Sequence, residues 1–228
     1  MEKIVLVYLF FLIIILLRFV FKINIRKAKK IEENKELQKI TDRFPGNVEI
    51  AKEMLQMLNN SKVKVEEAEN TKTSLYIAVT NKIIIADMKD NYARIQTIAH
   101  ECLHSVQDRT LLMFNFVFSN VTIFYWIIAI ILTICNVFIN TLLQMFILLL
   151  LFFTQTIVRA YLETDAMTKS KFLAKEYIKN KDLCTKDELQ ELIIEYEKIN
   201  NLGIPFYIYS LVTSSLIKII IYIIISFL

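Results

Sequence analysis

Glycine, proline and histidine are scarce in this chain of 228 residues, which has 2 Gly, 2 Pro and 2 His. Tight turns depend on glycine and proline, so an all-β fold with many hairpins is not expected. Cysteine is also rare, and Cys102, Cys135 and Cys184 show neither the spacing of a metal site nor a pattern of disulfide pairing. A reducing, cytosolic surrounding suits Cys102, which we interpret as a small core residue.

Apolar residues are abundant, at 55% of the chain, and they gather in long runs. The first, Ile4–Leu17, can extend past Arg18 to Phe21, which is long enough to span a membrane if the Arg18 side chain reaches the interface. The stretch Thr110–Val158 has no charged residue, and as a helix it would extend about 74 Å, more than twice a hydrocarbon core of about 30 Å. It therefore predicts two spans with a turn near Asn136–Thr141. A last run, Ile204–Leu228, is interrupted by Lys218. We expect a mostly α-helical integral membrane protein with about four transmembrane helices.

Basic residues indicate how such a chain would lie in a membrane. Most of the 27 Lys and Arg residues fall in Lys22–Arg109 and Arg159–Gly203, with a cluster between residues 26 and 30. By the positive-inside rule both segments are expected in the cytoplasm, with the amino terminus on the opposite side of the cell membrane. No small-residue cleavage site follows the first run, which predicts an uncleaved anchor. Acidic residues nearly balance the basic ones, so nothing indicates nucleic-acid binding.

The two histidines of the chain, His100 and His104, stand four residues apart with Glu101 next to the first. A step of four residues on a helix returns to the same face, so both imidazoles can bind one metal ion while the carboxylate of Glu101 lies beside its open coordination position. This is the HExxH arrangement of the zincin hydrolases. A chance occurrence on a solvated helix face is the alternative. The histidines project away from an apolar stripe at helical spacing, formed by Ile95, Ile98, Ala99, Cys102, Leu103 and Val106.

The ends of the motif helix carry acidic and amide side chains. Asp90 or Asn91 can cap its start. Asp108 follows His104 by one turn and is expected on the metal-facing side, where it can orient an imidazole. A plain acid at a solvated helix end is the alternative interpretation of Asp108.

A hydrolytic zinc site has three protein ligands and a water, so without a third histidine the remaining ligand is expected to be a carboxylate or a cysteine. An even number of spans returns the chain to the same side of the membrane at Arg159, and the first acids there are Glu163 and Asp165. We favour Glu163 as the ligand; the alternative for it is an i, i+4 ion pair with Arg159. Asp165 lies about 200° further round a helix, which suits support of a histidine or of the loop, or a plain surface acid.

Other segments are expected to complete a small α+β lobe. The sequence predicts an amphipathic helix at Val48–Leu58 and strands at Lys62–Glu66, Leu75–Val79 and Lys82–Ala86, with Thr80–Asn81 as a two-residue turn. An edge strand beside the motif helix can pair with an extended substrate or serve only as scaffold.

A second helix start is visible late in the chain. Thr185–Glu188 has the pattern of a capping box, and apolar residues follow it at helical spacing. Gly203 and Pro205 are expected to end this helix.

Taken together, these segments resemble the YugP-like neutral zinc metallopeptidases of bacterial membranes over nearly the full length, with a more distant likeness to the HtpX group. The resemblance rests on the first span with its basic end, on Ala99–Gln107, on the two-span hairpin and on Glu163–Ala166 opening a helix. It implies that both histidines and Glu163 bind one zinc ion per chain and that Glu101 is the catalytic acid/base. Leu103 stands where the family usually has glycine, and the family's Asp- and Tyr-containing segment ahead of the strands has no match.

The function expected from these features is a membrane-anchored zinc-dependent metalloendopeptidase, acting on a peptide or membrane-protein substrate at the cytoplasmic surface of the bilayer. Tyr92 and Tyr161 are candidate oxyanion donors only because they lie near the motifs; packing is the alternative. A non-catalytic metal-binding or scaffolding membrane protein with a vestigial motif is the alternative function. The expected parts are an anchor (1–21), a peptidase lobe (22–109), a two-span hairpin (110–158), cytoplasmic helices with the third ligand (159–203) and a last apolar segment (204–228).

Overall fold

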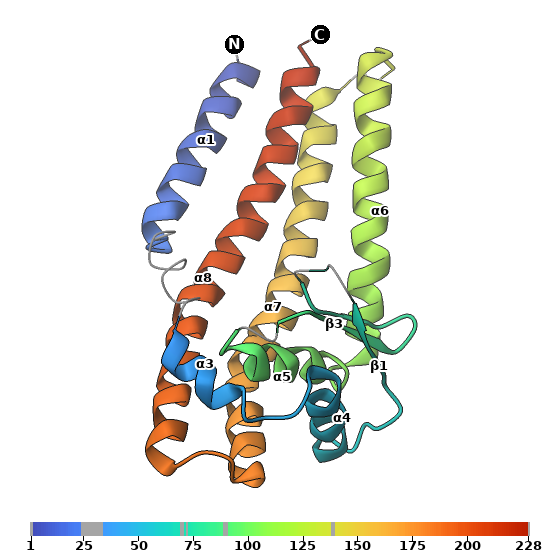
Figure 1. The fold of residues 1–228 in the computed structure, drawn as a ribbon. Helices are drawn as coiled ribbons and strands as arrows, with labels where there is room; N and C mark the ends of the chain where they lie inside the picture. The colour runs from blue at the N-terminus through green and yellow to red at the C-terminus, as the bar shows by residue number, and fades with distance from the viewer. Residues whose placement is uncertain are drawn as a thin grey trace. The chain divides into compact units, whose positions relative to one another are not determined.

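The structure of the protein is a computed structural model that describes residues 2–23, 34–68, 71, 73–88, 91–137 and 140–227. Helices make up most of the described residues, and a small three-stranded sheet accompanies them (Figure 1). The basic cluster between residues 26 and 30 and the candidate cap Asp90 lie outside the described residues. The helices are α1 (Glu2–Val20), α3 (Lys35–Thr41), α4 (Asn47–Met57), α5 (Arg94–His104), α6 (Arg109–Ile134), α7 (Thr141–Lys181) and α8 (Lys186–Ile225), and the strands are β1 (Lys64–Ala68), β2 (Leu75–Ile77) and β3 (Lys82–Ala86).

The chain packs as two compact units. The first, here called the apolar unit, comprises Met1–Ile23, Phe114–Tyr161 and Pro205–Leu228. The second, here called the polar lobe, comprises Asn24–Met113 and Leu162–Ile204. Helices α6, α7 and α8 contribute residues to both units.

Four helices, α1, α6, α7 and α8, are long and apolar enough to cross a membrane. This confirms the four apolar segments expected from the sequence, and the expected turn lies between Ile134 and Thr141. Within the apolar unit, polar atoms on different helices pair with one another. The indole nitrogen of Trp126 donates to the carbonyl oxygen of Lys218 at 3.0 Å. Such pairing is needed because an unpaired polar group in an apolar surrounding is costly.

Helices α7 and α8 are longer than the sequence indicated. The expectation that Glu163–Ala166 opens a helix was wrong, because these residues lie inside the continuous α7, which contains neither glycine nor proline. The capping box of α8 is confirmed: the backbone N–H of Thr185 donates to Glu188, and that of Glu188 donates to the Thr185 hydroxyl. Gly203 and Pro205 do not end α8, since the helix continues to Ile225. Pro205 removes one backbone donor, and the apolar residues beyond it keep the helical path.

Gly203 lies within α8, next to α7. A Cβ atom built on this residue would lie 2.9 Å from the terminal methyl carbon of Met167 on α7. Because that carbon ends a flexible side chain, a small movement of Met167 would make room for it.

The sheet of the polar lobe has the order β1-β3-β2. β1 runs parallel to β3, and β2 runs antiparallel to it, with Ile77 opposite Lys82. That register leaves a loop of residues 78–81, so the predicted two-residue turn at Thr80–Asn81 was wrong. Asn81 adopts a positive φ of 51°, a conformation that asparagine tolerates better than most residues. The strands lie close to their predicted positions, although the first begins and ends two residues later and the second is shorter.

One hydrophobic core holds the polar lobe together, and α5 supplies much of it. The amphipathic helix predicted at Val48–Leu58 is confirmed as α4, which packs against α5. The apolar stripe of α5 faces this core, and Cys102 within it is fully buried, as expected for a small core residue. The stripe packs against α4 and the sheet, so the opposite face of α5 points away from the core. That face carries the two histidines. Val106, which was predicted to belong to this stripe, lies beyond the end of α5 and is exposed; the buried stripe comprises Ile95, Ile98, Ala99, Cys102 and Leu103.

The first residue of α5 is a buried arginine that organises the neighbouring loop. The Arg94 guanidinium donates to the carbonyl oxygens of Thr41, Phe44 and Pro45 and to Oδ1 of Asn47, at 2.6–3.0 Å. Thr41 ends α3, Phe44 and Pro45 lie in the loop that follows, and Asn47 begins α4. Arg94 therefore fixes the start of the motif helix against the helices that pack on it.

Candidate metal centre

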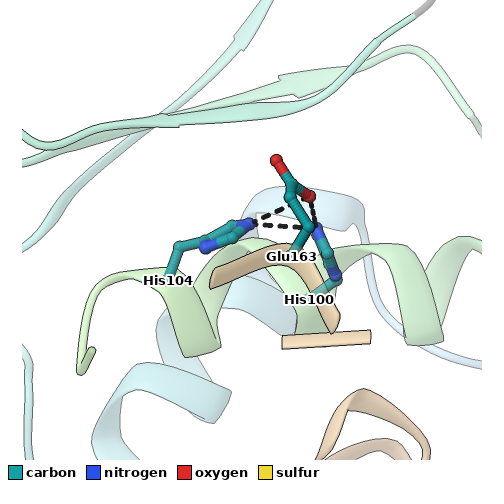
Figure 2. Close-up of side chains that lie close together, drawn as sticks. All are labelled: His100, His104 and Glu163. Carbon is teal, nitrogen blue, oxygen red and sulfur yellow. Dashed lines mark hydrogen bonds and ion pairs between the residues drawn. The ribbon is translucent and has the colours of Figure 1, made fainter. Parts of the chain in front are cut away.

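Three side chains from two helices of the polar lobe meet at one point. His100 and His104 project from α5, and Glu163 projects from α7 towards them (Figure 2). The Nε2 atoms of the two histidines are 3.0 Å apart. Oε2 of Glu163 lies 3.3 Å from Nε2 of His100 and 3.7 Å from Nε2 of His104. The fold therefore brings together three candidate ligands that lie far apart in the sequence.

These distances can be compared with the needs of a zinc ion. Zinc binds histidine nitrogen and carboxylate oxygen at about 2.0–2.2 Å, so neighbouring ligand atoms of a tetrahedral site are about 3.3–3.6 Å apart. The observed separations of 3.0, 3.3 and 3.7 Å bracket this range. Three atoms at this spacing occupy one face of a tetrahedron and leave its fourth corner for water. Within the described part of the chain, no other group of three or more His, Cys, Asp or Glu residues is close enough to hold a metal.

The electrostatics of the site favour a charged carboxylate. Burial alone would raise the pKa of Glu163, but the interactions with His100 and His104 outweigh it and hold this pKa well below its ordinary value. Burial likewise opposes a charge on His104, yet its contacts with Glu163 and Gln107 raise its pKa. Glu163 is therefore ionised at neutral pH, which is the form that a metal ligand requires.

Glu101 is buried beside the same three side chains, with 6% of its surface exposed. Burial raises the pKa of its carboxyl, the two histidine charges lower it, and the charge of Glu163 raises it; the net direction is upwards. Its carboxylate also accepts a hydrogen bond from the backbone N–H of Tyr76 on β2. A fixed carboxylate with a raised pKa is suited to accept and return a proton.

Gln107 closes the motif segment Ala99–Gln107, but the sequence analysis assigned it no role in the site. Its Oε1 atom lies 2.8 Å from Nδ1 of His104. Its Nε2 atom donates to the carbonyl oxygen of Leu162 at 2.7 Å and to Oδ2 of Asp165 at 3.0 Å. Asp165 thus contacts Gln107, which in turn contacts His104. Its place in the motif segment is the sequence signal for it, because α5 ends at His104 and helical spacing does not extend to Gln107.

Asp108 lies outside the candidate site. Helix α5 ends at His104, and the Asp108 carboxylate caps the next helix by accepting hydrogen bonds from the backbone N–H groups of Thr110 and Leu111. The expectation that it falls on the metal-facing side of the motif helix was therefore wrong. Its alternative, an exposed acid at a helix end, is what the structure shows.

The remaining candidates have different surroundings. Tyr92 is buried in the core of the polar lobe, and its carbonyl oxygen accepts a hydrogen bond from the hydroxyl of Tyr196. Tyr161 is exposed, and it precedes Glu163 by two residues on α7, about 200° round the helix. Arg159 donates to the hydroxyl of Tyr207, so the predicted alternative of an Arg159–Glu163 pair is not formed.

The geometry can be set beside known proteins. Comparison with curated proteins and with solved structures gave no match. The sequence pattern of one family, described as putative neutral zinc metallopeptidase, matches residues 5–225 and hence almost the whole chain. This protein therefore belongs to the putative neutral zinc metallopeptidase family.

Proposed function

We propose that the chain is a membrane-anchored metalloendopeptidase that holds one zinc ion through His100, His104 and Glu163. The observation that carries the proposal is the convergence of two imidazoles and one carboxylate at the spacing of zinc ligands. Membership of a zinc metallopeptidase family supports the choice of metal and of reaction class.

The chemistry follows from the residues around the ligands. A zinc ion bound there would lower the pKa of a bound water and polarise the scissile carbonyl group. Glu101 takes a proton as the water oxygen forms its bond to the carbonyl carbon. Glu101 then delivers that proton to the amide nitrogen as the carbon–nitrogen bond breaks, so the carboxylate is regenerated. Its burial keeps it fixed and raises its pKa towards the range in which a proton can be both accepted and returned.

We further propose that the site works at the cytoplasmic surface of the membrane. Four helices have the length and composition to cross a bilayer. Glu163 lies five residues beyond Val158, where the uncharged stretch ends, or about 7.5 Å along the continuous helix α7. Helix α6 begins five residues after His104. Both ligand-bearing segments thus run directly into apolar helices, and the excess of basic residues in the polar segments favours the cytoplasmic side.

The substitution Glu101→Gln tests the reaction without removing a ligand. Hydrolysis of a labelled unstructured protein by the purified full chain should fall at least about 100-fold, the effect of losing a general base. Zinc content should stay near one per chain. Glu176→Gln is the matched control, since Glu176 is exposed on α7. Unchanged hydrolysis in Glu101→Gln would exclude this mechanism.

The alternative function is a metal-binding or scaffolding membrane protein without catalysis. It shares the ligand cluster but assigns no proton transfer to Glu101. Stoichiometric zinc together with an absence of hydrolysis, against unstructured proteins and against membrane proteins in vesicles, would favour this alternative.

A further inference from the structure

Gln107 connects the two helices that supply the candidate ligands. It lies in the turn after α5, with its backbone N–H bonded to the carbonyl oxygen of His104. Its side-chain oxygen faces Nδ1 of His104 on α5, and its side-chain nitrogen faces Leu162 and Asp165 on α7. One amide group therefore contacts a candidate ligand, His104, and two neighbours of Glu163 on α7, Leu162 and Asp165.

The chemistry of these partners fixes which way the amide points. A backbone carbonyl oxygen and a carboxylate can only accept hydrogen bonds, so the amide nitrogen of Gln107 must face Leu162 and Asp165. The reversed orientation would place three acceptor oxygens against one another. Asp165 is itself held by Lys169, whose Nζ lies 2.6 Å from its other carboxylate oxygen.

The orientation of Gln107 in turn fixes the tautomer of His104. The amide oxygen that remains for His104 can only accept, so Nδ1 of the imidazole must carry the hydrogen. A neutral imidazole with a proton on Nδ1 has its lone pair on Nε2. Nε2 is the atom that faces His100 and Glu163. The lone pair is thus aimed at the position where a metal would bind.

We propose that Gln107 is a positioning residue, held by Asp165, that locks His104 in the tautomer competent to bind the metal. The lock ties the end of α5 to α7, so ligands from both helices are presented together. The identity of the metal as zinc rests on the proposed function, whereas the tautomer lock does not. Metal-binding histidines commonly donate their second nitrogen to a carboxylate or carbonyl. Here a glutamine relays that role from Asp165 of another helix.

Nitrogen NMR of the metal-free full chain tests the lock directly. Labelling with ¹⁵N-histidine yields signals from only two residues, and a His100→Asn variant assigns them. At alkaline pH we expect His104 to carry its hydrogen on Nδ1. In Gln107→Met the hydrogen should move largely to Nε2, the tautomer that histidine favours in water. Gln56→Met, at an exposed position on α4, is the matched control.

A pair of substitutions separates positioning from a loss of folding. Gln107→Glu places the new carboxylate against that of Asp165, and their repulsion should turn the side chain away from Nδ1 of His104, so the Nδ1–H form loses its acceptor. Adding Asp165→Asn replaces the repelling carboxylate by an amide that can donate to the new carboxylate at position 107. That carboxylate can then accept from Nδ1 of His104. The double variant should therefore restore the Nδ1–H form. Gln107→Met and Gln107→Glu should each also weaken zinc binding about 10–100-fold in a chelator competition, which is the usual effect of losing a partner of a ligating histidine.

The outcomes distinguish this proposal from the proposed function. An unchanged His104 tautomer in Gln107→Met, or no rescue in the double variant, would overturn the lock even if the chain hydrolyses peptides. If the His104 tautomer changes as expected in these variants but the chain hydrolyses no peptide, the lock is supported and the peptidase function is contradicted. Neither NMR measurement needs metal or substrate.

Discussion

The Oε2 atom of Glu163 lies 3.3 Å from Nε2 of His100, although the two residues belong to different helices. The contact predicts that Glu163→Ala loses the metal, since two imidazoles alone leave a hydrolytic zinc site one ligand short. We expect zinc affinity to fall more than about 100-fold, beyond the loss typical of an outer-shell change. Metal analysis of the purified chain in detergent measures this. Glu176→Ala on the same helix is the control, and stoichiometric zinc retained in Glu163→Ala would move the ligand assignment elsewhere.

From the hydrogen bonds of Arg94 we predict that the conservative substitution Arg94→Lys strongly lowers the stability of the protein. Arg94→Lys keeps the charge but cannot reach three carbonyl oxygens and the Asn47 amide in the same plane. Each buried acceptor left unpaired costs about 1–3 kcal/mol, so we expect a loss of about 2 kcal/mol or more in the free energy of unfolding. Chemical unfolding in detergent checks this. Arg43→Lys is the control, because Arg43 is exposed and pairs with Glu188 at the surface; an equal loss in both variants would refute the role of Arg94.

Glu53 predicts a pH-dependent contribution to stability. Its carboxylate on α4 accepts hydrogen bonds from Tyr177 and Lys181 on α7. Burial alone would raise the pKa of Glu53, but the bonds from Lys181 and Tyr177 outweigh it and lower this pKa. A depressed pKa means that the stabilisation is complete above the ordinary carboxyl range, around pH 4.5, and is lost as the pH falls through the lower folded-state value.

The substitution Glu53→Gln measures this contribution. We expect a loss of at most about 1 kcal/mol at neutral pH, since the pair is partly exposed. The difference from the unsubstituted chain should shrink as the pH falls below about 4. Thermal unfolding between pH 7 and pH 3 follows the trend, with Glu176→Gln as control. A gap that widens towards acid would contradict the assigned direction of the pKa shift.

The metal cluster could be predicted from the sequence because it depends on two simple periodicities. The four-residue step places His100 and His104 on one face of any helix, and the apolar stripe decides that this face points away from the core. The uncharged stretch after the motif predicted a hairpin, which returns the chain near its starting point at Glu163. Neither the shared face of the histidines nor the return of the chain at Glu163 depends on how individual side chains pack.

Helix ends were harder to predict, because tertiary contacts decide them. Helix α5 ends at His104, and the carbonyl oxygen of the next residue, Ser105, binds the Asn60 amide instead of continuing the helix. Asp108 consequently caps the next helix. Helix α8 continues past Pro205 although proline usually stops a helix. The role of Gln107 depends on which residues of α7 lie opposite the end of α5, a relationship that no local pattern encodes.

The natural cysteines offer a test of the proposed orientation. Cys135 is exposed in the turn between α6 and α7, whereas Cys184 lies between α7 and α8 and Cys102 is buried. Helix α7, which separates Cys135 from Cys184, is one of the candidate spans, so the two thiols are expected on opposite sides of the membrane. With the polar segments in the cytoplasm, Cys135 should face outwards.

A maleimide that cannot cross membranes should therefore label Cys135 in intact cells and Cys184 only after permeabilisation. Cys135→Ser and Cys184→Ser assign the two labels. Burial and the charge of Glu188 raise the pKa of the Cys184 thiol, so its labelling should accelerate with rising pH until the thiolate predominates. Labelling of Cys184 alone in intact cells would invert the orientation and place the candidate metal centre outside. Labelling of both thiols in intact cells would show that α7 does not separate two compartments.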